Sequence, residues 1–191
     1  MADVVTNYSD SAGASSVLFI NLVDNKKDQG KLGAEFKEVI DSLRPRVAHP
    51  LMFYWFDFHH ECKQKGKWQN LSKLVSLVDE RFRAQRFFCK LGNGTVTSWQ
   101  SGVIRTNCMD NLDRTNVVQS LFARRSLMMQ LGHPALLENN AHVLNSPWKT
   151  FEKVYKGIWA NNADAISVGY AGTGALKVDF TKTGKRTVKA W

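Results

Sequence analysis

The chain has 191 residues, of which 43% are hydrophobic and 11% aromatic, a composition typical of a globular domain and not of a disordered one. Its formal net charge of +9 favours anionic partners: phosphate esters, acidic membrane surfaces or nucleic acid. The sequence has no secretory signal and no apolar run near the ~20 residues that a spanning helix needs. We therefore expect a soluble protein whose membrane contact, if any, is peripheral.

The strongest local patterns alternate between strand and helix. Residues 1–16 are polar, small and aperiodic, and we expect a mobile arm there. Strands are predicted at residues 17–23, 51–58, 86–91 and 101–107, with a turn at 92–94. Helices are predicted at residues 31–43, 68–82, 115–131 and 148–159. This alternation predicts an α/β fold with a mixed central sheet flanked by helices.

The cysteines, Cys62, Cys89 and Cys108, are odd in number and form no C-x-x-C pair. A disulfide framework and a zinc site of usual spacing are therefore not expected. This usage fits a reducing, intracellular compartment.

One constellation carries chemistry: Cys108 is followed six residues later by Arg114 and then Thr115, between a predicted strand and a predicted helix. A loop that enters a helix N-terminus directs backbone N–H groups and the helix dipole at a phosphate. Arg114 can hold two phosphate oxygens with its planar guanidinium. The same field favours a Cys108 thiolate, and Thr115 can hydrogen-bond the sulfur as it leaves. The alternative is that Cys108 is simply a buried apolar residue.

Two acids lie inside this loop, Asp110 and Asp113, where extra negative charge beside a thiolate and a phosphate is unfavourable. One interpretation is that one of them caps the helix and the other faces solvent. The functional interpretation is that at least one is held protonated and donates to the leaving oxygen. The sequence does not say which.

These residues belong to RTNCMDNLDRTN (residues 105–116), which resembles the catalytic motif of the Sac-domain phosphoinositide phosphatases. Further segments resemble the same family: NLVD at 21–24, WFDFHHEC at 55–62 and YAGTGALKVDFTKTGKRT at 170–187. They follow the family's order and cover nearly the whole chain.

The resemblance implies a metal-independent, cofactor-free phosphatase. It implies that Cys108 is the nucleophile, Arg114 the phosphate-binding arginine, and Asp110 and Asp113 the acids on which activity depends. The other residues of the phosphate-binding loop are Met109, Asn111 and Leu112. Asn111 stands where the family usually has a second cysteine, which is not the nucleophile, so we expect activity to survive.

The resemblance also assigns residues outside the loop. Asp57 and His59 follow a predicted strand end, and the family match places them near the active-site pocket in a supporting role. A buried histidine bonded to the backbone is the alternative. Lys182, Lys185 and Arg186 match a family segment and are expected to contact lipid headgroups, although most charge runs are only solvated surface.

The expected partners are phosphoinositides on anionic membrane surfaces, on the cytoplasmic side of endomembranes. Nothing indicates a nucleic-acid module, and protein partners are not readable. Residues 17–191 are expected to form the Sac catalytic subdomain, without the family's N-terminal subdomain. A phosphoinositide-binding or scaffolding module without turnover, or a fragment that needs the missing subdomain, is therefore an alternative. A phosphatase for protein phosphotyrosine is less favoured by the flanking segments.

Overall fold

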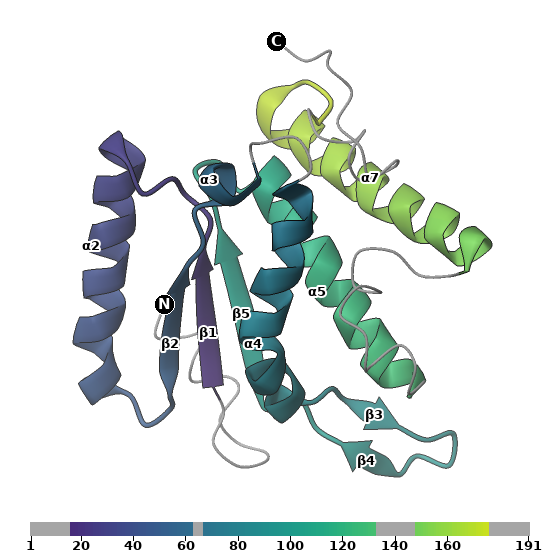
Figure 1. Cartoon of the computed structure of the whole chain (residues 1–191). Helices are drawn as coiled ribbons and strands as arrows, with labels where there is room; N and C mark the ends of the chain where they lie inside the picture. Colours follow the sequence, from purple (N-terminus) through teal and green to yellow (C-terminus); the bar gives the residue numbers. More distant parts are fainter. Residues whose placement is uncertain (1–15, 63–66, 133–147, 176–191) are drawn as a thin grey trace. The chain divides into compact units, whose positions relative to one another are not determined.

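A computed structural model of the chain describes residues 16–62, 67–132 and 148–175 (Figure 1). The chain divides into two compact units, residues 1–107 and 108–191, each with its own architecture. The predicted N-terminal arm lies outside the described residues, except for Ser16, which begins the first strand.

A three-stranded parallel sheet forms the centre of the first unit. Its strands, in spatial order, are β2 (Leu51–Trp55), β1 (Ser16–Asn21) and β5 (Gly102–Asn107). The middle strand is apolar and almost wholly buried, as a parallel strand covered on both faces must be. The predicted α/β class is confirmed: the described strands of this sheet are all parallel, and helices flank it.

One face of the sheet is covered by α2 (Lys27–Leu43). Ile40 and Phe36 of this helix pack with Val17 and Phe19 of β1, and the Phe36 and Phe19 rings meet edge to face with centroids 5.8 Å apart. The helix starts at Lys27 and not at the predicted residue 31. The prediction began late because the first turn is polar and shows no apolar periodicity. Its end at Leu43, just before Pro45, agrees with the prediction.

The opposite face is buried as well. Leu18 and Ile20 alternate with Val17 and Phe19 along β1, and both are fully buried. The connection from β2 to β5 runs through α4 (Leu71–Gln85), and Figure 1 shows α2 and α4 on opposite sides of the sheet. The connections from β1 to β2 and from β2 to β5 run in opposite directions across the sheet, and two right-handed crossovers of this kind place their helices on opposite faces. In α/β proteins with such a sheet, ligands bind at the carboxyl ends of the strands.

Two strand predictions need correction. The strand predicted at residues 86–91 is only β3 (Cys89–Lys90), and it pairs with the unpredicted β4 (Val96–Ser98) in an antiparallel hairpin outside the main sheet. The predicted turn is present, with Gly94 at φ +89°. Strands this short have too few residues to show a period of two.

The second correction concerns β2, which ends at Trp55 rather than at residue 58. The sequence has further apolar residues after Trp55, but Phe58 already begins α3 (Phe58–Cys62). Asp57 causes the change, because its Oδ1 accepts a hydrogen bond from the N–H of His60 at 2.9 Å, as a helix-capping side chain does.

The second unit is described as two helices, α5 (Asp113–Leu131) and α7 (Lys149–Ala171). Gly132 ends α5 in the left-handed region at φ +62°, as a terminal glycine is expected to do. The helix predicted at residues 148–159 is too short, because α7 continues to Ala171. The buried positions of that extension include Ala163 and Ser167, whose small side chains give a weak hydrophobic pattern. None of the helices in the described ranges is long and apolar enough to cross a bilayer.

Candidate active site

The loop that carries the predicted nucleophile lies between the last residue of β5 and the first turn of α5. Cys108 follows Asn107 directly and is only 5% exposed. The hydroxyl of Thr115, from the first turn of α5, donates a hydrogen bond to the Cys108 sulfur at 3.3 Å. A hydroxyl donor to sulfur stabilises the thiolate and the departing thiolate alike. The context is therefore a strand, a short loop and a helix N-terminus.

Asp110 contacts the same sulfur from within the loop. The Cys108 thiol donates to Asp110 Oδ1 at 3.3 Å, and the Leu112 N–H donates to the same oxygen at 3.1 Å. Burial acts to raise the pKa of this carboxyl, but the hydrogen bonds from Leu112 and Cys108 and the charge of Arg114 outweigh it and lower the pKa. Asp110 is consequently a carboxylate at neutral pH, able to accept a proton but not to give one.

Asn111 shapes the loop. Its backbone has φ +57°, in the left-handed region that asparagine tolerates better than most residues. Its Oδ1 accepts a hydrogen bond from the N–H of Cys108 at 3.0 Å. Asn111 itself is exposed, so this bond, and not packing, is the main contribution of its side chain.

The remaining loop residues differ in exposure. Arg114 is 7% exposed, and its charge acts on Asp110. Asp113 is half-buried as the first residue of α5. Met109 is exposed and Leu112 is half-buried. The loop residues named from the sequence thus gather in one short segment of the second unit.

Asp57 and His59 belong to the first unit, at the carboxyl edge of its sheet. Asp57 Oδ2 accepts the N–H of Asn25 at 3.0 Å, in addition to the Oδ1 contact that caps α3. His59 Nδ1 lies 2.8 Å from Asp24 Oδ1. Both residues therefore join the segment after β2 to the segment after β1, and a place near the substrate pocket stays a prediction.

Sequence reasoning missed two partners at this edge. Asp24 pairs with His59 although the two are far apart in sequence. The sequence feature that could have predicted this role is an acidic residue just after a strand. Asn107 donates from Nδ2 to Asn21 Oδ1 at 2.8 Å. Asn21 is 1% exposed, and within the described part of the chain its Nδ2 has no hydrogen-bond acceptor.

A buried ionic network joins α5 to α7 within the second unit. Arg124 is 3% exposed, donates to both carboxylate oxygens of Glu152, and lies with its guanidinium carbon 4.4 Å from the centre of the Tyr155 ring. Lys156 Nζ lies 3.3 Å from Glu152. Asn116, next to Thr115, donates to the carbonyl of Trp159 at 3.2 Å. These contacts hold α7 against α5 from the first turn of α5, at Asn116, to its middle, at Arg124.

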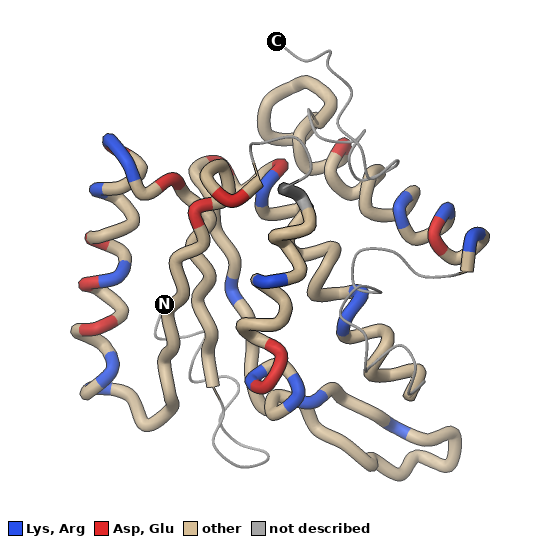
Figure 2. Tube along the Cα trace, in the orientation of Figure 1, with Lys and Arg blue, Asp and Glu red and all other residues tan. Residues whose placement is uncertain are grey.

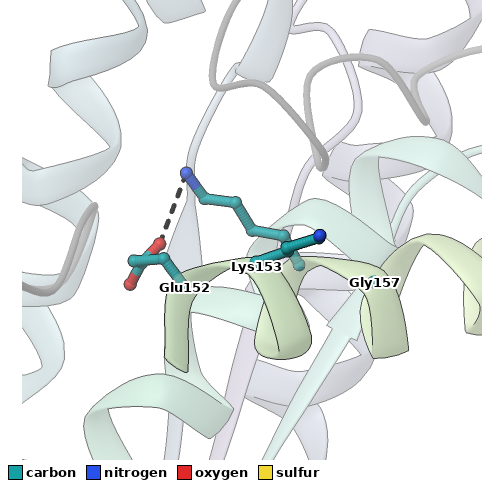
Figure 3. Close-up of a pocket in the computed structure, with 4 residues that line it drawn as sticks. Glu152, Lys153 and Gly157 are labelled. Carbon is teal, nitrogen blue, oxygen red and sulfur yellow. Dashed lines mark ion pairs between the residues drawn. The ribbon is translucent and has the colours of Figure 1, made fainter. Parts of the chain in front are cut away.

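A surface hollow of about 400 Å³ lies on α7, lined by Glu152, Lys153, Lys156 and Gly157 (Figure 3). The residues that line it do not include the loop residues. Figure 3 marks an ion pair of Glu152 with a dashed line, and the partner is Lys156. Arg124 pairs with the same carboxylate, so two cations share one negative charge. The contacts of the Cys108 thiol, and not this hollow, identify the candidate active site.

Basic and acidic residues are interleaved along the helix that covers the sheet. Figure 2 shows lysines alternating with Asp and Glu along α2, where Lys37 pairs with Asp41 at 2.6 Å. The basic cluster predicted to contact lipid, Lys182, Lys185 and Arg186, lies outside the described residues.

The fold is α/β, and its loop between a strand and a helix fits the fold of Cys-based phosphatases. A family model described as the SacI homology domain matches residues 1–63. Phosphatidylinositol-3-phosphatase SAC1-A of Danio rerio is 44% identical over 170 residues, which are 89% of this chain and 28% of the relative. The chain is similar to the Sac-domain phosphoinositide phosphatases over most of its length.

Two further relatives show how widely the similarity extends. Phosphatidylinositol-3-phosphatase SAC1 of Saccharomyces cerevisiae is 39% identical over 180 residues, covering 88% of this chain and 27% of the relative. Phosphoinositide phosphatase SAC6 of Arabidopsis thaliana is 33% identical over 174 residues, covering 91% and 28%. The chain thus spans less than a third of the length of the curated relatives it matches.

Proposed function

We propose that the protein hydrolyses a phosphomonoester on the inositol ring of a phosphoinositide, through a phosphocysteine formed on Cys108. The observation that carries the proposal is the Cys108 sulfur, which Thr115 and Asp110 contact at 3.3 Å at the start of α5. The names of the relatives support the substrate class.

The proposed first step uses the hydrogen bond between Cys108 and Asp110. The Asp110 carboxylate takes the thiol proton, and the thiolate electron pair attacks phosphorus. Arg114 and the loop amides stabilise the charge on the phosphate oxygens. The bond from phosphorus to the inositol oxygen breaks, and the protonated Asp110 returns its proton to that oxygen. Because Asp110 first takes the thiol proton, a residue that starts as a carboxylate can then act as the general acid.

The proposed second step regenerates the enzyme. Water attacks the phosphocysteine, the bond between sulfur and phosphorus breaks, and inorganic phosphate leaves. The Thr115 hydroxyl, already directed at the sulfur, stabilises the departing thiolate. Asp110 accepts the proton from the attacking water and passes it back to the thiolate. Asp113, which begins α5, is the alternative proton carrier.

We place the protein on the cytoplasmic surface of endomembranes, as a peripheral protein. The net charge of +9 supports attraction to an anionic lipid surface. Phosphatidylinositol 3-phosphate is the first substrate to test, because several relatives carry that specificity in their names.

The test is phosphate release from a panel of short-chain phosphoinositides, with the Cys108→Ser protein assayed in parallel. We expect release by the unchanged protein, and binding without release by the Ser variant. An active Ser variant would overturn the mechanism. Lipid binding without release by folded, unchanged protein would replace the proposal with that of a binding module.

A further inference from the structure

The Cys108 backbone is held by one side-chain contact, which is separate from the contacts to its sulfur. Asn111 Oδ1 accepts the Cys108 N–H at 3.0 Å. Because Cys108 is 5% exposed, solvent cannot easily replace a lost acceptor, and the N–H would be left unsatisfied. The contact also closes a small ring from the nucleophile to the turn that leads into α5.

The backbone at Asn111 makes that contact possible. At φ +57° the chain reverses, which brings the side chain of Asn111 back over the start of the loop. Glycine can adopt this left-handed backbone but has no side-chain acceptor. Alanine lacks the acceptor and also disfavours the backbone, whereas aspartate tolerates the backbone and keeps the acceptor. The three substitutions therefore separate the conformation of the loop from the hydrogen bond.

We propose that Asn111 is a positioning residue for the nucleophile: its hydrogen bond fixes the Cys108 backbone so that the sulfur stays against the Thr115 hydroxyl. Without the bond, Cys108 turns more freely, and the sulfur spends less time within reach of Thr115. The thiolate then loses part of its stabilisation. The inference rests on the proposed function only in taking Cys108 as the nucleophile, because the reactivity of its thiol can be measured without any lipid.

The experiment follows alkylation of Cys108 by iodoacetamide as a function of pH, using the full chain and peptide mass spectrometry. Cys89, in the hairpin of the first unit, is an internal reference in every sample. In the Asn111→Gly protein we expect the midpoint pH for Cys108 to rise by about one unit, a tenfold smaller thiolate fraction at low pH. The Cys89 profile should not move.

The Asn111→Asp protein keeps the acceptor but adds a negative charge. We expect its midpoint to rise too, and to return toward that of the unchanged protein in about 1 M salt, where screening acts within ~3 Å. The shift in Asn111→Gly should persist in salt, because it arises from a lost contact and not from charge. A shift in Asn111→Gly that salt removes would contradict the proposal.

The hairpin offers a matched control. Asn93 is also a loop asparagine whose Oδ1 accepts a backbone N–H, that of Thr95 at 3.0 Å. Asn93→Gly makes the same chemical change in the other unit and should leave Cys108 alkylation unchanged. An unchanged Cys108 midpoint in Asn111→Gly, or a midpoint that moves in Asn111→Ala alone, would overturn the proposal.

Turnover gives the second readout. We expect Asn111→Gly to lower kcat about tenfold with little change in KM, because the sulfur and not the headgroup is displaced. If the unchanged protein releases no phosphate from any lipid, the proposed function fails. The alkylation profiles would still decide whether Asn111 positions Cys108.

Discussion

Asp110 Oδ1 lies 3.3 Å from the Cys108 sulfur and 3.1 Å from the Leu112 nitrogen, so one carboxylate oxygen links the thiol to a loop amide. In the proposed reaction both of these groups act on the phosphate, so the substrate would take over contacts that the carboxylate makes. Its position next to the thiol is also the position from which it can take the thiol proton.

Replacing Asp110 with Asn separates these two effects. The thiolate should form at lower pH, because a neighbouring negative charge is gone, and alkylation of Cys108 should speed up. Phosphate release should fall about 10²- to 10⁴-fold, the usual contribution of a proton-transfer group. Parallel pH profiles of alkylation and turnover measure both. Asp113→Asn is assayed in the same way, because Asp113 is the alternative proton carrier. Equal turnover in Asp110→Asn and the unchanged protein would show that Asp110 does not transfer the proton.

The contact between Thr115 and the sulfur gives a prediction with a conservative rescue. Thr115→Val removes the hydroxyl while keeping the shape of the side chain, and we expect kcat to fall about fivefold, since a single hydrogen bond contributes about 1 kcal/mol. Thr115→Ser keeps the hydroxyl and should retain most activity. Steady-state kinetics on short-chain lipid distinguish the two, and equal losses in both variants would indicate a packing role instead.

The surroundings of Cys108 show which features could be predicted from sequence. The apolar run before Cys108 and the helical stripe through Val117, Val118 and Leu121 were sufficient to place the loop between a strand and a helix, because burial follows periodicity. The hydrogen bond from Cys108 to Asn111 was not predictable, since it depends on a left-handed backbone at one residue. No local pattern specifies that conformation for asparagine.

Contacts between residues far apart in sequence could not be predicted for a different reason. His59 and Asp24 meet only because β2 and β1 are neighbouring parallel strands that end at the same edge of the sheet. The order of strands is a property of the whole fold, and the individual segments predict only that a strand exists. The same limit applies to Arg124 and Glu152, whose pairing depends on how α5 packs with α7.

Gly33 and Gly157 form a matched pair for stability. A Cβ at Gly33 would lie 2.4 Å from a ring carbon of Trp55 and 2.8 Å from Asn21 Nδ2, so Gly33→Ala should destabilise the protein by about 1–3 kcal/mol. A Cβ at Gly157 of α7 meets no described atom within 4 Å, and Gly157→Ala should stabilise it by about 0.5–1 kcal/mol. Urea unfolding of both variants tests this, and changes of the same sign would contradict the close packing of Trp55 on α2.

Tyr155 provides a pH test of the packing between α5 and α7. Burial, the main influence, raises the pKa of its phenol to about 12, although the charge of Arg124 acts in the opposite direction. The hydroxyl donates to the Ser120 carbonyl at 2.6 Å, which requires the protonated form. Because the folded pKa is above the ordinary value of 10, the stabilisation is complete below pH 10 and is lost as pH rises through about 12.

A titration of tyrosinate absorbance can resolve this group among the four tyrosines of the chain. We expect a late step near pH 12 that is absent from the Tyr155→Phe protein, and a decline in urea stability of the unchanged protein that begins near pH 10. The Phe variant should be less stable at neutral pH, since the Ser120 carbonyl loses its donor, and less sensitive to alkali. If Tyr155 titrated together with the other tyrosines in folded protein, the phenol would be open to solvent and α7 would not pack on α5 at this point.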